Sequence, residues 1–341
     1  NTSSSDVTAP KESLARWQAM RFGMFVHWGP VALKGTEIGW SRGRDVPVAE
    51  YDQLYRRFDP TRFDADAWVA TATAAGMKYL VMTTKHHDGF CLWDSRHTEY
   101  DIAATPLRRD ILRELSDACK AQQMMFCTYH SICDWYHADY PLGSPGGKST
   151  KANPNMSRYV EYLHSQTAEI IRNYGPVGIM WFDGEWESPW THAMGVELYK
   201  HIRSLQPDIL INNRVDKGRR GMEGTTQSGE FLGDYETPEQ RVGGFNRAEP
   251  WESCITIGSQ WAWKPDDKLK SLQQCIHTLL HVVGGDGNLL LNVGPMPDGR
   301  IEPRQVQRLR EIGQWLDEFG DTVYGTRGGP FKPGPWGAST C

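Results

Sequence analysis

The chain has 341 residues, of which 39% are hydrophobic and 23% are charged, a composition typical of a globular protein. Its formal net charge of -5 is mild, and its Lys and Arg residues form no run that would attract nucleic acid or an anionic membrane surface. No apolar segment approaches the roughly 20 residues that a membrane-spanning helix needs. We therefore expect neither nucleic acid nor a membrane as a partner.

Strand-like and helix-like segments alternate along the chain. Short apolar runs predict strands at 22–27, 79–84, 124–129, 179–183, 208–212, 251–257 and 288–293. Helical periodicity and terminal glycines predict helices at 64–75, 109–123, 156–174, 195–205, 269–283 and 305–319. Strands that alternate with helices in this way imply a parallel sheet with short crossover connections.

The fold class expected from this order is α/β, a (β/α)8-like barrel of the TIM type that is irregular in its second half. The seven predicted strands are one short of a closed barrel, so we expect the eighth within the polar, glycine-rich second half, where 218–244 is the expected active-site loop. No G-x-G-x-x-G motif follows a strand, which argues against a Rossmann core. The barrel is expected over 13–326, between a flexible N-terminus (1–12) and a Gly/Pro-rich tail (327–341).

The cysteines give no metal-binding signal. Their spacing matches no zinc pattern, and several stand in apolar runs, where cysteine is usually a small core residue. The seven are Cys91, Cys119, Cys127, Cys133, Cys254, Cys275 and Cys341. We expect no cofactor.

The segment 177–186 carries the clearest single signal. An apolar run flanked by Gly175-Pro176 and Gly184 predicts a buried strand, and this strand ends in Asp183. Burial of an ionisable group is costly, and parallel barrels carry their active sites at the carboxyl ends of the strands. We therefore expect Asp183 to be a functional carboxylate.

Histidines follow three of the other predicted strands. His27 ends the first, His86 and His87 follow the second, and His130 ends the third. Two interpretations are open: metal ligands, or partners for a hydroxyl-rich ligand. No H-x-H or H-E-x-x-H spacing is present, whereas neutral imidazole both donates and accepts hydrogen bonds. The 14 tryptophans, several of them near strand ends, also favour a carbohydrate.

Hydrolysis of a glycosidic bond requires two carboxyl groups, one on each side of that bond. Asp183 would be one of them. Glu236 and Glu239, in the glycine-rich stretch, and Glu252, in a predicted strand, are candidates for the other. Their spacing alone does not choose among them.

Six motifs along the chain together resemble the α-L-fucosidases of glycoside hydrolase family 29. The resemblance extends from about residue 16 to residue 324, nearly the whole chain. The motifs are Phe-Val-His27-Trp-Gly, Lys-His86-His87-Asp-Gly-Phe, Trp-Phe-Asp183-Gly-Glu-Trp, Asn-Asn-Arg214, Trp251-Glu-Ser-Cys and Asn288-Leu-Leu-Leu-Asn-Val-Gly-Pro.

The resemblance implies a retaining exo-glycosidase that releases terminal α-L-fucose from glycans or glycoconjugates through a covalent fucosyl-enzyme. It implies Asp183 as the nucleophile and Glu236 as the acid/base, with Glu239 and Glu252 in reserve. The substrate-binding residues that it implies are His27, Trp40, His86, His87, Tyr129, His130, Trp181, Arg214 and Trp263.

Two other functions stay open at this point: a fucose-binding protein without catalytic activity, and a metal-dependent barrel hydrolase. The partner implied by the resemblance is a fucosylated oligosaccharide or glycoconjugate, and that substrate class implies a secreted, periplasmic or lysosomal location. Family members often carry a C-terminal β-sandwich, which is expected to begin about where this sequence ends. Linkage preference and oligomeric state stay undetermined by the sequence.

Overall fold

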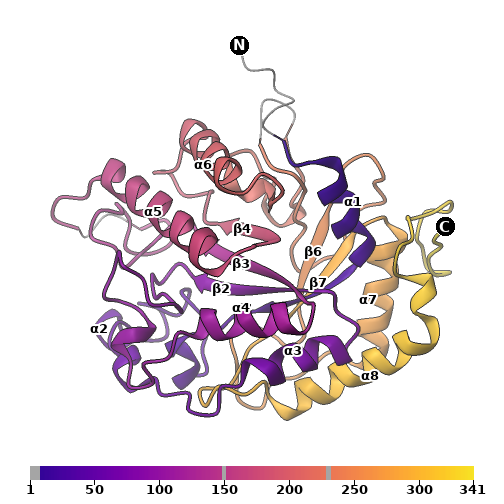
Figure 1. The fold of residues 1–341 in the computed structure, drawn as a ribbon, viewed down its shortest axis with the longest axis horizontal. Coiled ribbons are helices and arrows are strands. Elements are labelled where there is room, and N and C mark those ends of the chain that lie inside the picture. The colour runs from indigo at the N-terminus through magenta and orange to yellow at the C-terminus, as the bar shows by residue number, and fades with distance from the viewer. Residues whose placement is uncertain (1–7, 148–150, 228–231) are drawn as a thin grey trace.

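The computed structural model describes residues 8–147, 151–227 and 232–341. A seven-stranded parallel sheet curls through its centre with helices packed around it (Figure 1). The strand order is β5-β4-β3-β2-β1-β7-β6. The strands are β1 (Phe22–Val26), β2 (Tyr79–Lys85), β3 (Met125–Ser131), β4 (Ile179–Asp183), β5 (Leu210–Ile211), β6 (Glu252–Thr256) and β7 (Asn288–Val293).

Side-chain caps explain where most of the helices begin. Asp64, Asp110, Asn155 and Thr191 each accept a hydrogen bond from the backbone N–H three residues later, and Ser271 forms a capping box with Gln274. The helices are α1 (Lys11–Met20), α2 (Val48–Tyr51), α3 (Ala65–Ala74), α4 (Ile111–Ala121), α5 (Met156–Tyr174), α6 (His192–Leu205), α7 (Leu272–Gly284) and α8 (Pro303–Phe319). Among the described residues, none of these helices is both long enough and apolar enough to span a bilayer.

The sequence did not predict α1, which begins at Lys11, inside the stretch expected to be flexible. Its Trp17 is fully buried and packs against Tyr79 and Tyr235 in the barrel interior. Residues 1–7 lie outside the described part of the chain. Leu14 and Met20 of the same helix are partly buried and pack against the same cluster, so a short apolar face centred on Trp17 holds α1 to the barrel.

The eighth position of the barrel is filled by an irregular segment. Tyr235 forms a parallel bridge with Asn212, which follows β5. Glu236 and Glu239 form parallel bridges with Trp251 and with Cys254 of β6. The segment 235–239 thus connects the two edge strands of the sheet, and the fold class expected from the sequence is confirmed, including its irregular second half.

Alternation along the strands decides which side chains enter the barrel. Phe25, Tyr129, Trp181 and Leu290 belong to one buried cluster inside the sheet, whereas their neighbours in sequence pack outward against the helices. Because the side-chain period of a strand is two residues, Asp183 at the end of β4 lies on the same inner face as Trp181. The polar residues that end the inward-facing positions of these strands therefore lie at the mouth of the barrel.

Candidate active site

A pocket of about 260 Å³ opens at the carboxyl ends of the strands. Seven of the residues expected from the sequence line it: His27, Trp40, His86, Tyr129, Trp181, Asp183 and Arg214. Glu239 lines it as well. The structure therefore places these side chains around one cavity.

Asp183 lies at the base of the pocket, in contact with three partners. Arg214 Nη1 donates to Asp183 Oδ1 at 2.9 Å, and the Tyr129 hydroxyl donates to Asp183 Oδ2 at 3.0 Å. His87 Nε2 lies 3.5 Å from Oδ2. Burial opposes ionisation of this carboxyl, but the nearby charges, above all that of Arg214, outweigh it and lower the pKa of Asp183. Asp183 is therefore held as a carboxylate.

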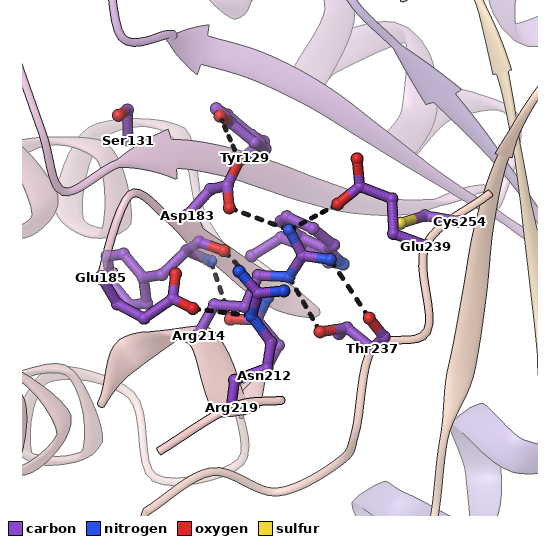
Figure 2. A network of polar contacts seen from close by, with 12 residues as sticks. Tyr129, Ser131, Asp183, Glu185, Asn212, Arg214, Arg219, Thr237, Glu239 and Cys254 are labelled. Atoms are coloured by element: carbon purple, nitrogen blue, oxygen red, sulfur yellow. Dashed lines mark hydrogen bonds and ion pairs between the residues drawn. The ribbon is translucent and has the colours of Figure 1, made fainter. Parts of the chain in front are cut away.

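Arg214 joins Asp183 to a second carboxylate. Its Nη1 also lies 2.9 Å from Glu239 Oε2, and Figure 2 shows the two acids on either side of the guanidinium group. Arg214 is fixed by hydrogen bonds to the hydroxyl and the carbonyl oxygen of Thr237 and stacks over Trp181, 4.6 Å from the ring centroid. The closing segment of the barrel thus brings Glu239 opposite β4.

The other two acid/base candidates lie elsewhere. Glu236 faces a separate cavity and accepts a hydrogen bond from the backbone N–H of Thr226 at 2.7 Å. Glu252 is fully buried within the barrel, where Tyr79 and Trp181 donate to it at 2.5 and 3.0 Å. Neither glutamate lines the pocket that holds Asp183. Glu236 and Glu239 are three residues apart along the extended closing segment, so their side chains point to opposite sides, whereas Glu252 lies at the amino end of β6, away from the mouth.

Three histidines at the strand ends near Asp183 are neutral rings. Burial lowers the pKa of His27 to about 3 and that of His87 to about 4, and it also lowers the pKa of His86. His27 Nδ1 lies 2.6 Å from Asn292 Oδ1, and His87 Nδ1 lies 2.6 Å from Ser131 Oγ. His86 Nδ1 is buried and has no hydrogen-bond partner among the described residues. This nitrogen lies against Gly39 and is closed to solvent, so it is not a contact for a ligand in the pocket.

Three expected binding residues do not line the pocket. One is His87, although its Nε2 lies 3.5 Å from Asp183 Oδ2. His130 points to the outer face of β3, where its Nδ1 meets the Thr84 hydroxyl at 2.9 Å, because it follows the inward-facing Tyr129. Trp263 donates to Glu302 at 3.2 Å, away from the pocket. The aromatic wall next to His27 is Trp261 instead, with ring centroids 4.8 Å apart.

A sequence model of the α-L-fucosidase family matches residues 2–321. The chain belongs to the α-L-fucosidase family. It is 27% identical to the tissue α-L-fucosidase of Bos taurus over 331 residues, which cover 90% of this chain and 68% of the relative. It is 30% identical to the α-L-fucosidase of Dictyostelium discoideum, with 90% of this chain and 70% of the relative covered.

Two solved fucosidase structures extend this similarity to three dimensions. The α-L-fucosidase isoenzyme 1 from Paenibacillus thiaminolyticus matches with a TM-score of 0.88 and 36% identity, over 97% of this chain and 81% of that one. A family 29 α-L-fucosidase from Bacteroides thetaiotaomicron, trapped as a covalent intermediate, matches with a TM-score of 0.86 and 30% identity, over 98% and 80%. The family, the enzyme class and the retaining mechanism expected from the sequence are confirmed.

Sequence reasoning missed several residues of this fucosidase pocket. They are Phe25, Trp186, Arg219, Met222, Cys254 and Trp261. The period of two along a strand would have placed Phe25 beside His27, and Trp186 belongs to the motif that contains Asp183. Arg219, Met222 and Trp261 lie on loops without such a period, so only the fold brings them to the pocket. Among the described residues, no group of three or more His, Cys, Asp or Glu side chains forms a candidate metal site.

Proposed function

We propose that the protein removes terminal α-L-fucose from fucosylated oligosaccharides or glycoconjugates, with Asp183 as the nucleophile and Glu239 as the acid/base. One observation carries the assignment: both carboxylates lie 2.9 Å from the same nitrogen of Arg214. Their nearest oxygens are therefore within twice that distance of each other, in keeping with the roughly 5–5.5 Å that separates the carboxyl groups of retaining glycosidases.

In the first step, Asp183 attacks the anomeric carbon while Glu239 protonates the departing glycosidic oxygen. In the second step, Glu239 takes a proton from water, and that water cleaves the fucosyl ester of Asp183. Asp183 loses its negative charge at the moment when Glu239 gains one. The guanidinium group of Arg214 contacts both carboxyl groups. It therefore pairs with the Asp183 carboxylate before the first step and with the Glu239 carboxylate after it.

The same pocket has the chemistry to hold the sugar. His27 and His86 line the pocket as neutral rings, which can donate to and accept from fucose hydroxyls. Trp261 and Trp181 supply apolar surface for the faces and the methyl group of the sugar.

Hydrolysis of an aryl α-L-fucoside by Asp183→Ala, Glu239→Ala and the matched variant Glu236→Ala tests these roles. We expect the first two variants to lose activity and Glu236→Ala to retain it. Added azide should rescue Asp183→Ala as the β-fucosyl azide and Glu239→Ala as the α-fucosyl azide, because azide replaces the nucleophile in one case and the incoming water in the other.

Loss of activity in Glu236→Ala, with azide rescue as the α-azide, would transfer the acid/base role to Glu236. Absence of any turnover by the unaltered protein on aryl and branched fucosides would indicate a binding protein. Loss of activity on treatment with a chelator would indicate a metal-dependent hydrolase.

Substrates of this class lead us to propose a secreted, periplasmic or lysosomal location. Fucosylated glycoconjugates are displayed or broken down in these compartments. Fractionation of the source cells, with fucosidase activity measured in each fraction, tests this, and activity confined to the cytosol would contradict it.

A further inference from the structure

The fucosidase pocket is buried at its base and exposed at its rim. Asp183 at the base is 9% exposed, whereas Trp186 and Met222 at the rim are 38% and 49% exposed. Single exposed apolar side chains are common on protein surfaces, but these two flank the same cleft, where ligand pockets carry apolar and aromatic lining. The catalytic roles proposed above do not use either residue.

One side of the rim is a rigid aromatic surface. Trp40 and Trp186 stack with ring centroids 6.1 Å apart and an interplanar angle of 14°. Each also meets the ring of His87 edge to face, at 5.7 and 5.3 Å. Trp186 comes from the loop that follows β4, three residues after Asp183. The exposed tryptophan is thus held in place beside the reacting carboxylate.

A second part of the rim contacts the segment that carries Glu239. Glu239 N–H donates to the carbonyl oxygen of Met222 at 3.0 Å, so the loop that carries Met222 lies directly against Glu239. Arg219 of the same loop lies over Trp186, 5.9 Å from the ring centroid, and is paired with Glu185 at 2.6 Å. Figure 2 shows this arginine–glutamate pair beside Asp183 and Arg214.

We propose that Trp186, Met222 and Arg219 form a subsite for the leaving group, and that the group it fits is a sugar ring. This inference rests on the function proposed above. An acid/base must lie beside the glycosidic oxygen, so a leaving group that Glu239 protonates lies next to Met222 and faces Trp186. A pyranose presents an apolar C–H face to the indole and hydroxyls to the guanidinium donors, which match this surface.

Two substrates that differ only in the leaving group test the proposal. α-L-Fucosyl fluoride has no leaving-group ring, whereas an α-L-fucosyl-N-acetylglucosamine disaccharide has one. We expect Trp186→Ala and Met222→Ala to lower kcat/KM for the disaccharide by about tenfold or more relative to their effect on the fluoride. Trp186→Phe should recover part of the loss. Trp336→Ala, which removes a 61% exposed tryptophan from the C-terminal tail, is the matched control.

A second measurement is independent of the first chemical step. A 2-fluorofucosyl donor should trap the unaltered enzyme as a covalent 2-fluorofucosyl intermediate. N-Acetylglucosamine should speed the release of 2-fluorofucose from this intermediate by accepting the sugar. This acceleration should disappear in Trp186→Ala, while hydrolysis by water continues. Equal losses on fluoride and disaccharide, or no loss on either, would overturn the subsite. Failure of the unaltered enzyme to cleave the fluoride would instead overturn the function on which the subsite rests.

Discussion

Replacement of Glu252 by Gln should change how the stability of the barrel depends on pH. The Glu252 carboxyl is fully buried, and burial raises its pKa from 4.5 to about 7. The charged carboxylate accepts from both Trp181 Nε1 and the Tyr79 hydroxyl. Protonation leaves one acceptor oxygen and adds one O–H donor, and a glutamine amide likewise has one acceptor oxygen and N–H donors. The variant therefore copies the protonated state at every pH.

The sign and size of the effect follow from linkage. The folded state binds this proton more tightly than the unfolded chain does. The contribution of the protonated Glu252 to the free energy of unfolding is therefore complete below pH 4.5 and is lost as the pH rises to 7. At about 1.4 kcal/mol per pKa unit, the loss is about 3 kcal/mol. Relative to the unaltered protein, Glu252→Gln should thus gain about 3 kcal/mol of unfolding free energy between pH 4.5 and pH 8.

Urea unfolding of both proteins across this pH range measures the difference in unfolding free energy between Glu252→Gln and the unaltered protein. The comparison requires that the two proteins have equal m-values. Glu318→Gln removes one charge from an exposed position on α8 and is the control, so its gap to the unaltered protein should stay constant. A Glu252→Gln gap that is the same at pH 4.5 and pH 8 would refute the reasoning.

Two further predictions concern the walls of the pocket. Arg214→Met should raise the pKa of Asp183, because the main charge that lowers it is removed, and the acid limb of a kcat/KM–pH profile should move to higher pH. An unmoved limb would contradict this. Glu37 accepts from the backbone N–H of Trp261 at 2.8 Å, so Glu37→Ala should leave that donor unsatisfied, at about 1–3 kcal/mol. We expect a raised KM for an aryl fucoside, and Glu37→Gln should be less impaired; unchanged kinetics would show that Glu37 does not position Trp261.

The parts of the fold that could be predicted are those with strong local signals. The bounds of α5, β4 and β7 agree with the sequence prediction, because a cap begins α5 and because both strands are apolar runs buried on both faces. α1 was missed since it buries only Ser13 and Trp17. The eighth strand was expected in the glycine-rich second half, but its residues were not assigned, because bridges to other strands, rather than its own propensity, make 235–239 extended.

The site residues that could be predicted are likewise those with a local signal in the sequence. Asp183 could be predicted because it ends a strand, and the position at a strand end determines which rim of the barrel a side chain reaches. His130 also follows a predicted strand, but it lies on the outer face, one residue out of phase with Tyr129. Loop direction decides which of two nearby residues reaches the pocket, as for Glu236 and Glu239 or for Trp261 and Trp263. No periodicity in the sequence predicts that direction.

The irregular eighth position of the barrel has a consequence for catalysis. β5 is only two residues long, so beyond Tyr235 the closing segment has no strand to pair with on that side. Pro238 lacks an N–H group, and its carbonyl oxygen accepts from Cys254 of β6 at 3.0 Å. The free edge of the segment instead binds the loop that contains Met222, through the Glu239 N–H. A full-length β5 would occupy this edge and displace that loop, so the short strand allows Glu239, the proposed acid/base, to meet the Met222 loop at one pocket.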